Sequence, residues 1–104
     1  DYWSPYGNGD MLDRTWQLAF TMGYRADDLI EHAVAVATRG GRSIVDASVQ
    51  RLTSVDDRPG LAVGDPADLL LVAGETVTSA VMDRPVDRTV LRAGRVVADG
   101  LELV

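Results

Sequence analysis

The hydrophobic and polar positions follow two different patterns along the chain. Residues 10–45 repeat with a helical period, whereas residues 61–99 read as strands separated by turn residues. Asp10 suits the N-cap of a first helix, and Gly23 suits a left-handed stop after it. The apolar positions that share one face of this predicted helix are Leu12, Trp16, Ala19 and Phe20.

A second helix is predicted to begin near Asp27–Asp28, because acidic side chains complement the positive end of the helix dipole. Its apolar face is formed by Ile30, Ala33, Val34 and Ala37. Gly40–Gly41 is predicted to stop this helix, with a short helical turn over residues 42–45 after it.

The second pattern begins after a segment without clear periodicity, residues 47–58, which we expect to be a loop. A tight turn at Gly64–Pro66 precedes Leu69–Val72, which is apolar at every position. A strand that is apolar on both sides is typically buried on both sides, so this strand is predicted to be fully covered. Residues 76–82 alternate less cleanly within the same strand-like region.

A hairpin is predicted near the end of the chain. Residues 89–91 and 96–98 are rich in β-branched side chains, and Ala93–Gly94 lies between them as a turn. Arg84, Arg88 and Arg95 are expected to be surface or hairpin residues.

Length and composition narrow the possible functions. The 104 residues allow one small domain, and the net charge of −6 argues against a nucleic-acid partner. All ten cationic residues are Arg, which we interpret as a genomic composition bias. No apolar run approaches the roughly 20 residues of a membrane span, so we expect a cytoplasmic protein with no membrane partner. Residue 1 is Asp rather than Met, and an internal cut is the expected origin of the chain.

Few side chains could carry chemistry. The absence of Cys excludes disulfides and thiolate metal sites, and His32 is the single histidine. A zinc site needs three or four ligands, so His32 is expected to be packed or solvated rather than metal-bound. Asp27–Asp28 has a helix-cap explanation and Asp56–Asp57 a turn explanation. Asp68 is interpreted as structural, accepting backbone N–H groups from the adjacent turn.

Three segments carry a resemblance to a known family. They are Asp1–Gly7 with the sequence DYWSPYG, Gly64–Val72 with GDPADLLLV, and Arg84–Val97. Together they resemble the C-terminal end of the amidohydrolase superfamily, most closely the cytosine deaminase type. The second segment is common to many amidohydrolases, including dihydropyrimidinase-like enzymes and N-acyl amino acid deacylases. The first and third segments favour the deaminase branch.

The resemblance implies a (β/α)8 barrel with a small β-structure built from strands at both chain ends. In such enzymes a metal at the mouth of the barrel activates the attacking water, and a glutamate moves protons. The resemblance therefore implies an α+β chain. Residues 1–46 would hold a barrel loop and the last barrel helices, and residues 47–104 the C-terminal strands of a composite β-sandwich.

The resemblance also implies roles for two residues at the start of the chain. Trp3 would help to wall the substrate pocket of the intact enzyme, where a flat apolar side chain suits a heteroaromatic ring. Packing of the loop onto the barrel is the alternative role for Trp3. Asp1 would lie just beyond the last metal ligand, so no catalytic or metal-ligating residue is assigned within the chain.

Two functional hypotheses remain open from the sequence. In the first, the chain is the C-terminal portion of an amidohydrolase that uses a divalent metal, zinc or iron, and is inactive alone. Its small-molecule substrate would be cytosine, an isopropylamino-triazine or another cyclic amide or amine, and its partner the missing N-terminal barrel. In the second, the chain is a stand-alone structural or oligomerisation module that self-associates, because its helix faces, including Trp16 and Phe20, lack a cover.

Overall fold

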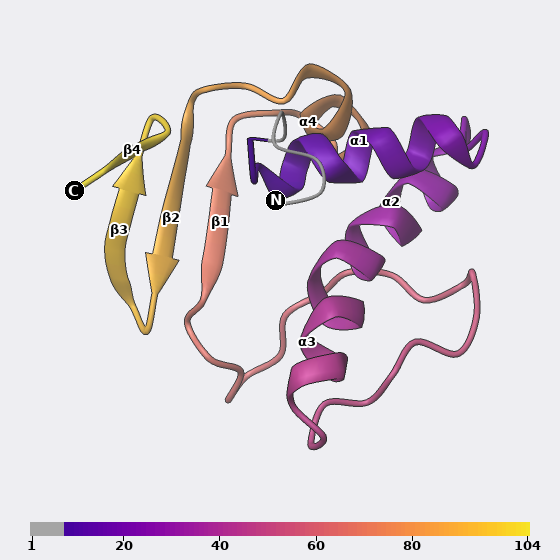
Figure 1. Cartoon of the computed structure of the whole chain (residues 1–104), viewed down its shortest axis with the longest axis horizontal. Coiled ribbons are helices and arrows are strands. Elements are labelled where there is room, and N and C mark those ends of the chain that lie inside the picture. Colours follow the sequence, from indigo (N-terminus) through magenta and orange to yellow (C-terminus); the bar gives the residue numbers. More distant parts are fainter. Residues whose placement is uncertain (1–7) are drawn as a thin grey trace.

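Helices and an antiparallel sheet lie side by side in the computed structural model, which describes residues 8–104 (Figure 1). The described elements make an α+β arrangement in which the sheet follows four helical segments, with one further helix inserted between its first two strands. In chain order they are α1 (Met11–Thr21), α2 (Asp27–Ala35), the π-helical turn η1 (Val36–Gly40), α3 (Gly41–Val45), β1 (Leu69–Val72), α4 (Val77–Asp83), β2 (Arg88–Arg92), β3 (Arg95–Asp99) and β4 (Glu102–Leu103).

Helix α1 begins and ends as the sequence predicts. The Asp10 carboxylate accepts the backbone N–H of Leu12 at 2.9 Å, which satisfies one of the free N–H groups of the first turn. Gly23 follows the helix with a φ of +70°, a conformation that glycine adopts without a steric penalty. Helix α1 lies across the start of α2 (Figure 1).

The predicted stop at Gly40–Gly41 is wrong, because the helical path continues through η1 into α3 and ends at Val45. Both glycines have right-handed helical angles, with φ values of −57° and −60°. A Cβ at Gly40 would lie 3.1 Å from the Leu52 side chain. The glycine thus permits a close approach of the following loop to the helical path, at the point where the π turn ends.

The strand-like interpretation of residues 76–82 is also wrong, since Val77–Asp83 forms helix α4. Thr76 accepts the N–H of Ser79 through Oγ1 at 3.0 Å, and Ser79 Oγ accepts the N–H of Thr76 at 3.1 Å. This reciprocal capping box fixes the helix start. The imperfect alternation placed this segment in the strand-like region, but the capping interactions decide the conformation.

The sheet has the strand order β1-β2-β3-β4 with antiparallel neighbours. The predicted hairpin is confirmed: Ala93 and Gly94 have φ values of 50° and 79°, and they join β2 to β3. Two consecutive left-handed residues match the twist of the flanking strands. Strand β4, which the sequence pattern did not predict, pairs with the end of β3.

Strand β1 forms as predicted, but it is not buried on both faces. Leu70 is 46% exposed and Leu71 is 56% exposed. The strand is at one edge of the sheet, paired only with β2, and the hydrophobic core reaches only its last residue, Val72. The apolar run therefore presents side chains that the described residues leave uncovered.

The hydrophobic core lies among α1, α2 and α4 rather than between the helices and the sheet. Trp16 packs at its margin, whereas Phe20 stacks on Trp16 with ring centroids 5.6 Å apart and stays 64% exposed. No helix in residues 8–104 is long and apolar enough to cross a membrane. The buried core residues are Leu12, Ala19, Ile30, Ala33 and Val81.

Candidate functional site

A buried ion pair joins the start of α1 to the start of β2. One Arg88 guanidinium nitrogen lies 3.0 and 3.1 Å from the two Asp10 carboxylate oxygens. Arg88 also donates to the carbonyl oxygens of Pro85 at 2.7 Å and Arg84 at 3.0 Å. Of the two expected places for Arg88, the hairpin is confirmed and the surface is wrong: Arg88 lies in β2 and is only 6% exposed, because these acceptors replace water around the charge.

Arg84 is likewise not a simple surface residue. Its guanidinium lies 4.4 Å from the centre of the Trp16 ring and pairs with Asp13 at 3.3 Å. It also donates to the Met82 carbonyl at 2.8 Å, at the end of α4. These contacts tie α4 to α1 and hold Arg84 in a left-handed conformation with a φ of 46°. Arg95 is exposed in β3, as expected.

Asp68 has a structural role, but its partner differs from the predicted one. Its carboxylate accepts the N–H of Ala93 at 2.9 Å, which fastens the β2–β3 turn to the entry of β1. In the preceding turn the corresponding bond is made by Asp65, which accepts the N–H of Ala62 at 2.8 Å. The long separation between Asp68 and Ala93 explains why the sequence suggested the nearer turn instead.

The loop after α3 is organised by Asp57. Its carboxylate accepts the N–H groups of Thr53 at 2.7 Å and Ser54 at 3.0 Å and pairs with Arg39 at 3.2 Å. The backbone N–H of Thr53, then that of Ser54, lowers the pKa of Asp57 from its ordinary value of 3.8. The turn explanation of Asp56–Asp57 is thus confirmed.

His32 is buried on α2 and packs against the loop that follows α3. Its Nδ1 lies 3.0 Å from the backbone carbonyl oxygen of Asp57, and the Tyr24 ring meets it edge-on at 6.4 Å between centroids. Because a carbonyl can only accept, Nδ1 carries the proton. Across the described residues no group of three or more His, Asp or Glu side chains could hold a metal ion.

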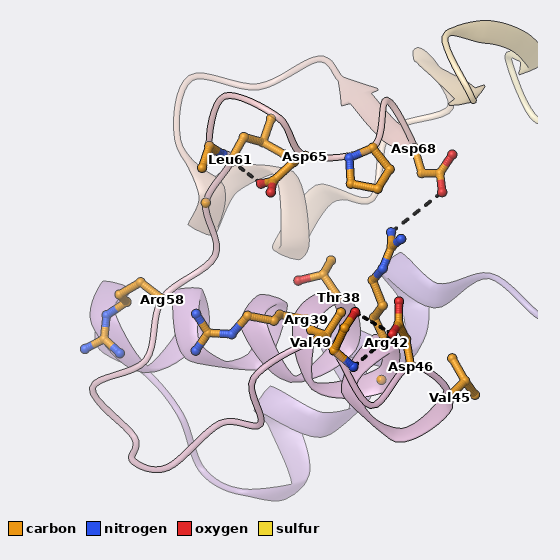
Figure 2. Close-up of a pocket in the computed structure, with 15 residues that line it drawn as sticks. Thr38, Arg39, Arg42, Val45, Asp46, Val49, Arg58, Leu61, Asp65 and Asp68 are labelled. Atoms are coloured by element: carbon orange, nitrogen blue, oxygen red, sulfur yellow. Dashed lines mark hydrogen bonds and ion pairs between the residues drawn. The ribbon is translucent and has the colours of Figure 1, made fainter.

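A hollow of about 1150 Å³ lies between the α2–α3 helical path and the loop that leads to β1 (Figure 2). Arginine side chains line it, but each guanidinium already faces a carboxylate of this chain. The pairs are Arg39 with Asp57 at 3.2 Å, Arg42 with Asp68 at 3.7 Å, and Arg58 with Asp28 and Glu31, both at 3.8 Å. Among the described residues this hollow therefore offers no free cationic anion site, and the Ser48 hydroxyl that lines it donates to the Asp46 carboxylate at 2.7 Å.

The predicted pocket residue Trp3, together with Asp1, lies outside the described residues. The pocket role of Trp3 stays a prediction. What sequence reasoning missed within the described residues is the Asp10–Arg88 pair, since no local spacing links two residues 78 positions apart.

No protein-family model and no curated protein matches the chain. Among solved structures, the chain is similar to the N-isopropylammelide isopropylaminohydrolase from Burkholderia multivorans ATCC 17616. The two are 34% identical with a TM-score of 0.72. The match covers 100% of this chain and 24% of that chain.

The chain is amidohydrolase-like over its whole length. It spans about a quarter of the solved relative, 24%. The similarity supports the amidohydrolase resemblance seen in the sequence and does not distinguish the cytosine deaminase branch from its neighbours.

Proposed function

We propose that this chain is the C-terminal part of a metal-dependent amidohydrolase that hydrolyses a C–N bond of a cyclic, nitrogen-rich substrate. The observation that carries the proposal is the whole-chain similarity, at 34% identity, to an N-isopropylammelide isopropylaminohydrolase. Of the substrates that the sequence left open, N-isopropylammelide and cytosine are the first two to assay.

The described side chains indicate which functions of the proposed enzyme would belong to other parts of the polypeptide. They contain no group that could hold a metal ion, so the zinc or iron ligands would belong to other parts of the polypeptide. A divalent metal bound there would supply an activated water. The contribution of residues 8–104 is then to pack against the barrel and to hold the segment that precedes α1.

The two faces of the sheet support a covered position in a larger protein. Residues directly opposite one another on antiparallel strands share a face, so the register places one apolar row across all four strands and a second row on the other face. A sheet with apolar side chains on both faces needs a layer on each. The first row is Leu70, Val90, Ala98 and Leu103, and the second is Leu69, Leu91 and Val96.

Helix α1 carries an uncovered apolar stripe in addition to its core face. Met11, Leu18 and Met22 recur along it at helical spacing, and Met11 and Met22 are exposed. An apolar groove runs between this stripe and the η1 turn, lined in part by Val36 and Ala37. We propose that the barrel covers this groove and that an additional strand or sheet layer covers the rows of the sheet.

The test uses the complete polypeptide that contains this segment, purified with its metal. We expect bound zinc or iron by elemental analysis, and release of an amine or ammonia from N-isopropylammelide or cytosine. The matched control is the 104-residue chain alone, which should bind no metal and release no amine. A complete polypeptide without a His-x-His motif, without bound metal and without activity on either substrate would overturn the proposal.

The alternative is a self-associating structural module, and the exposed sheet rows are the observation that favours it. Association of the 104-residue chain is expected under both proposals, so it does not separate them. A reading frame that extends upstream through a barrel with a His-x-His motif supports the enzyme. A frame that lacks such a barrel supports the module.

A further inference from the structure

Asn8 is the only asparagine in the chain, and Gly9 follows it directly. Both residues are exposed, and a Cβ built at Gly9 would meet no atom of residues 8–104 within 4 Å. The Asn8 side-chain oxygen accepts the backbone N–H of Asp10 at 2.9 Å, which forms an Asx turn. We propose that Asn8 is a site of spontaneous deamidation, a covalent modification independent of the proposed enzymatic function.

The reaction needs only water and a weak base. The Gly9 backbone nitrogen loses its proton and attacks the side-chain carbonyl carbon of Asn8, forming a C–N bond. The bond from that carbon to the amide nitrogen breaks, and ammonia leaves after accepting a proton. Water then opens the five-membered succinimide at either carbonyl, which gives aspartate or isoaspartate.

Two features of the structure favour attack at this position. Glycine has no side chain to obstruct its amide nitrogen, and no atom of the described residues crowds the position of a Cβ at Gly9. The N–H of Asp10 donates to the Asn8 oxygen and so withdraws electron density from the carbon that is attacked. The Asx turn thus activates the side chain as well as holding it beside its own backbone.

A second dipeptide of the same kind, Asp99–Gly100, provides an internal comparison. There the backbone N–H of Gly100 donates to the Arg88 carbonyl at 2.9 Å. The Asp99 carboxylate accepts the Thr89 hydroxyl at 3.1 Å. Succinimide formation at this site would have to free the Gly100 nitrogen from its bond to the Arg88 carbonyl, so the fold protects it.

The modification would alter the junction between α1 and β2. Aspartate at position 8 adds a negative charge two residues before Asp10, whose carboxylate already caps α1 and pairs with Arg88. Isoaspartate also lengthens the backbone by one carbon, which removes the geometry of the Asx turn. The product with isoaspartate should therefore lose the hydrogen bond from the Asp10 N–H to the side chain at position 8. The ion pair between Asp10 and Arg88 should stay intact.

The experiment uses the Asp99→Asn variant, which places an Asn–Gly dipeptide at both sites of one molecule. The folded variant, checked by far-ultraviolet circular dichroism, is incubated at mildly alkaline pH and digested with trypsin. The two sites fall into separate peptides, one ending at Arg14 and one beginning after Arg95. Mass spectrometry then measures conversion at each site, and enzymatic methylation quantifies isoaspartate.

We expect position 8 to convert at least about tenfold faster than position 99 in the folded chain, a barrier difference of about 1.4 kcal/mol. In concentrated urea the rates of conversion at the two positions should converge. The Asn8→Gln substitution should abolish the conversion measured in the peptide that ends at Arg14. Equal rates in the folded chain would overturn the proposal. So would a rate at Asn8 about tenfold slower in the folded chain than in urea.

Discussion

Arg88 and Asp10 are separated by 78 positions, yet their side chains meet at 3.0 and 3.1 Å in a pair that is largely shielded from water. The same Asp10 carboxylate caps α1 through the N–H of Leu12. One carboxylate therefore couples the first helix to the second strand of the sheet. This coupling fixes where the helical part of the fold sits relative to the sheet (Figure 1).

Replacing Arg88 with Met should destabilise the fold by about 3 kcal/mol. The Asp10 carboxylate would lose its partner, and the carbonyl oxygens of Pro85 and Arg84 would lose a donor. Urea unfolding followed by circular dichroism measures the change. Arg95→Met is the matched control, since Arg95 is exposed and should shift stability by no more than about 0.5 kcal/mol. Equal effects of the two substitutions would contradict the buried role of Arg88.

Two substitutions at Asp10 separate its capping role from its ion pair. Asp10→Ser keeps a side-chain acceptor for the Leu12 N–H but removes the charge that faces Arg88. Asp10→Ala removes both, and it should be less stable than Asp10→Ser by about 1 kcal/mol. In a double-mutant cycle, adding Arg88→Met to Asp10→Ser should cost less than Arg88→Met alone. Strictly additive effects would show that the two side chains do not interact.

The capping box of α4 makes a separate stability prediction. Thr76→Ala removes the acceptor for the Ser79 N–H and should cost about 1 kcal/mol. Thr76→Asn preserves an acceptor at the N-cap and should retain most of the stability. Thermal unfolding of both variants provides the comparison, and an Ala variant as stable as the parent would show that the cap contributes nothing.

The loop held by Asp57 should loosen in acid. The pKa of Asp57 is lowered below 3.8, chiefly by the N–H of Thr53. A carboxyl whose folded pKa is depressed contributes stability that is present above its unfolded pKa and lost as pH falls through the folded pKa. Proteolysis of the loop should therefore accelerate below about pH 4, the ordinary aspartate range. In the Asp57→Asn variant the loop should be cleaved readily at neutral pH, and its rate of cleavage should change little in acid.

The parts of the fold that the sequence predicted depend on interactions between near neighbours. The cap at Asp10, the stop at Gly23 and the hairpin turn at Ala93–Gly94 each follow from the preferences of one or two residues. The failures have different causes: helix α4 follows from a local capping box that the pattern did not reveal, whereas the wrongly predicted helix stop has a long-range cause. Gly40 serves the approach of Leu52 rather than a helix stop, and no periodicity records such a contact.

The candidate site shows the same division. The structural roles of Asp57 and His32 could be anticipated from their types and spacing. The burial of Arg88 could not, because an arginine at the start of a strand is usually exposed and only its distant partner reverses that expectation. The pocket role of Trp3 depends on a resemblance alone and stays a prediction.

The uncovered rows of the sheet make the last prediction, which concerns the 104-residue chain in isolation. Leu103 in the first row is 89% exposed, and Leu71, which lies on the same face as the second row, is 56% exposed. Uncovered apolar side chains of this kind drive association. We expect sedimentation at micromolar concentration to give a mass above that of one chain, 11.2 kDa. Leu71→Lys should shift the distribution toward the monomer, because a charge on the face of an edge strand opposes pairing with another chain. Arg95→Lys, on an exposed β3 position, is the control and should leave it unchanged. A single-chain mass for the parent would contradict the prediction and would show that the uncovered rows are too small to hold two copies together.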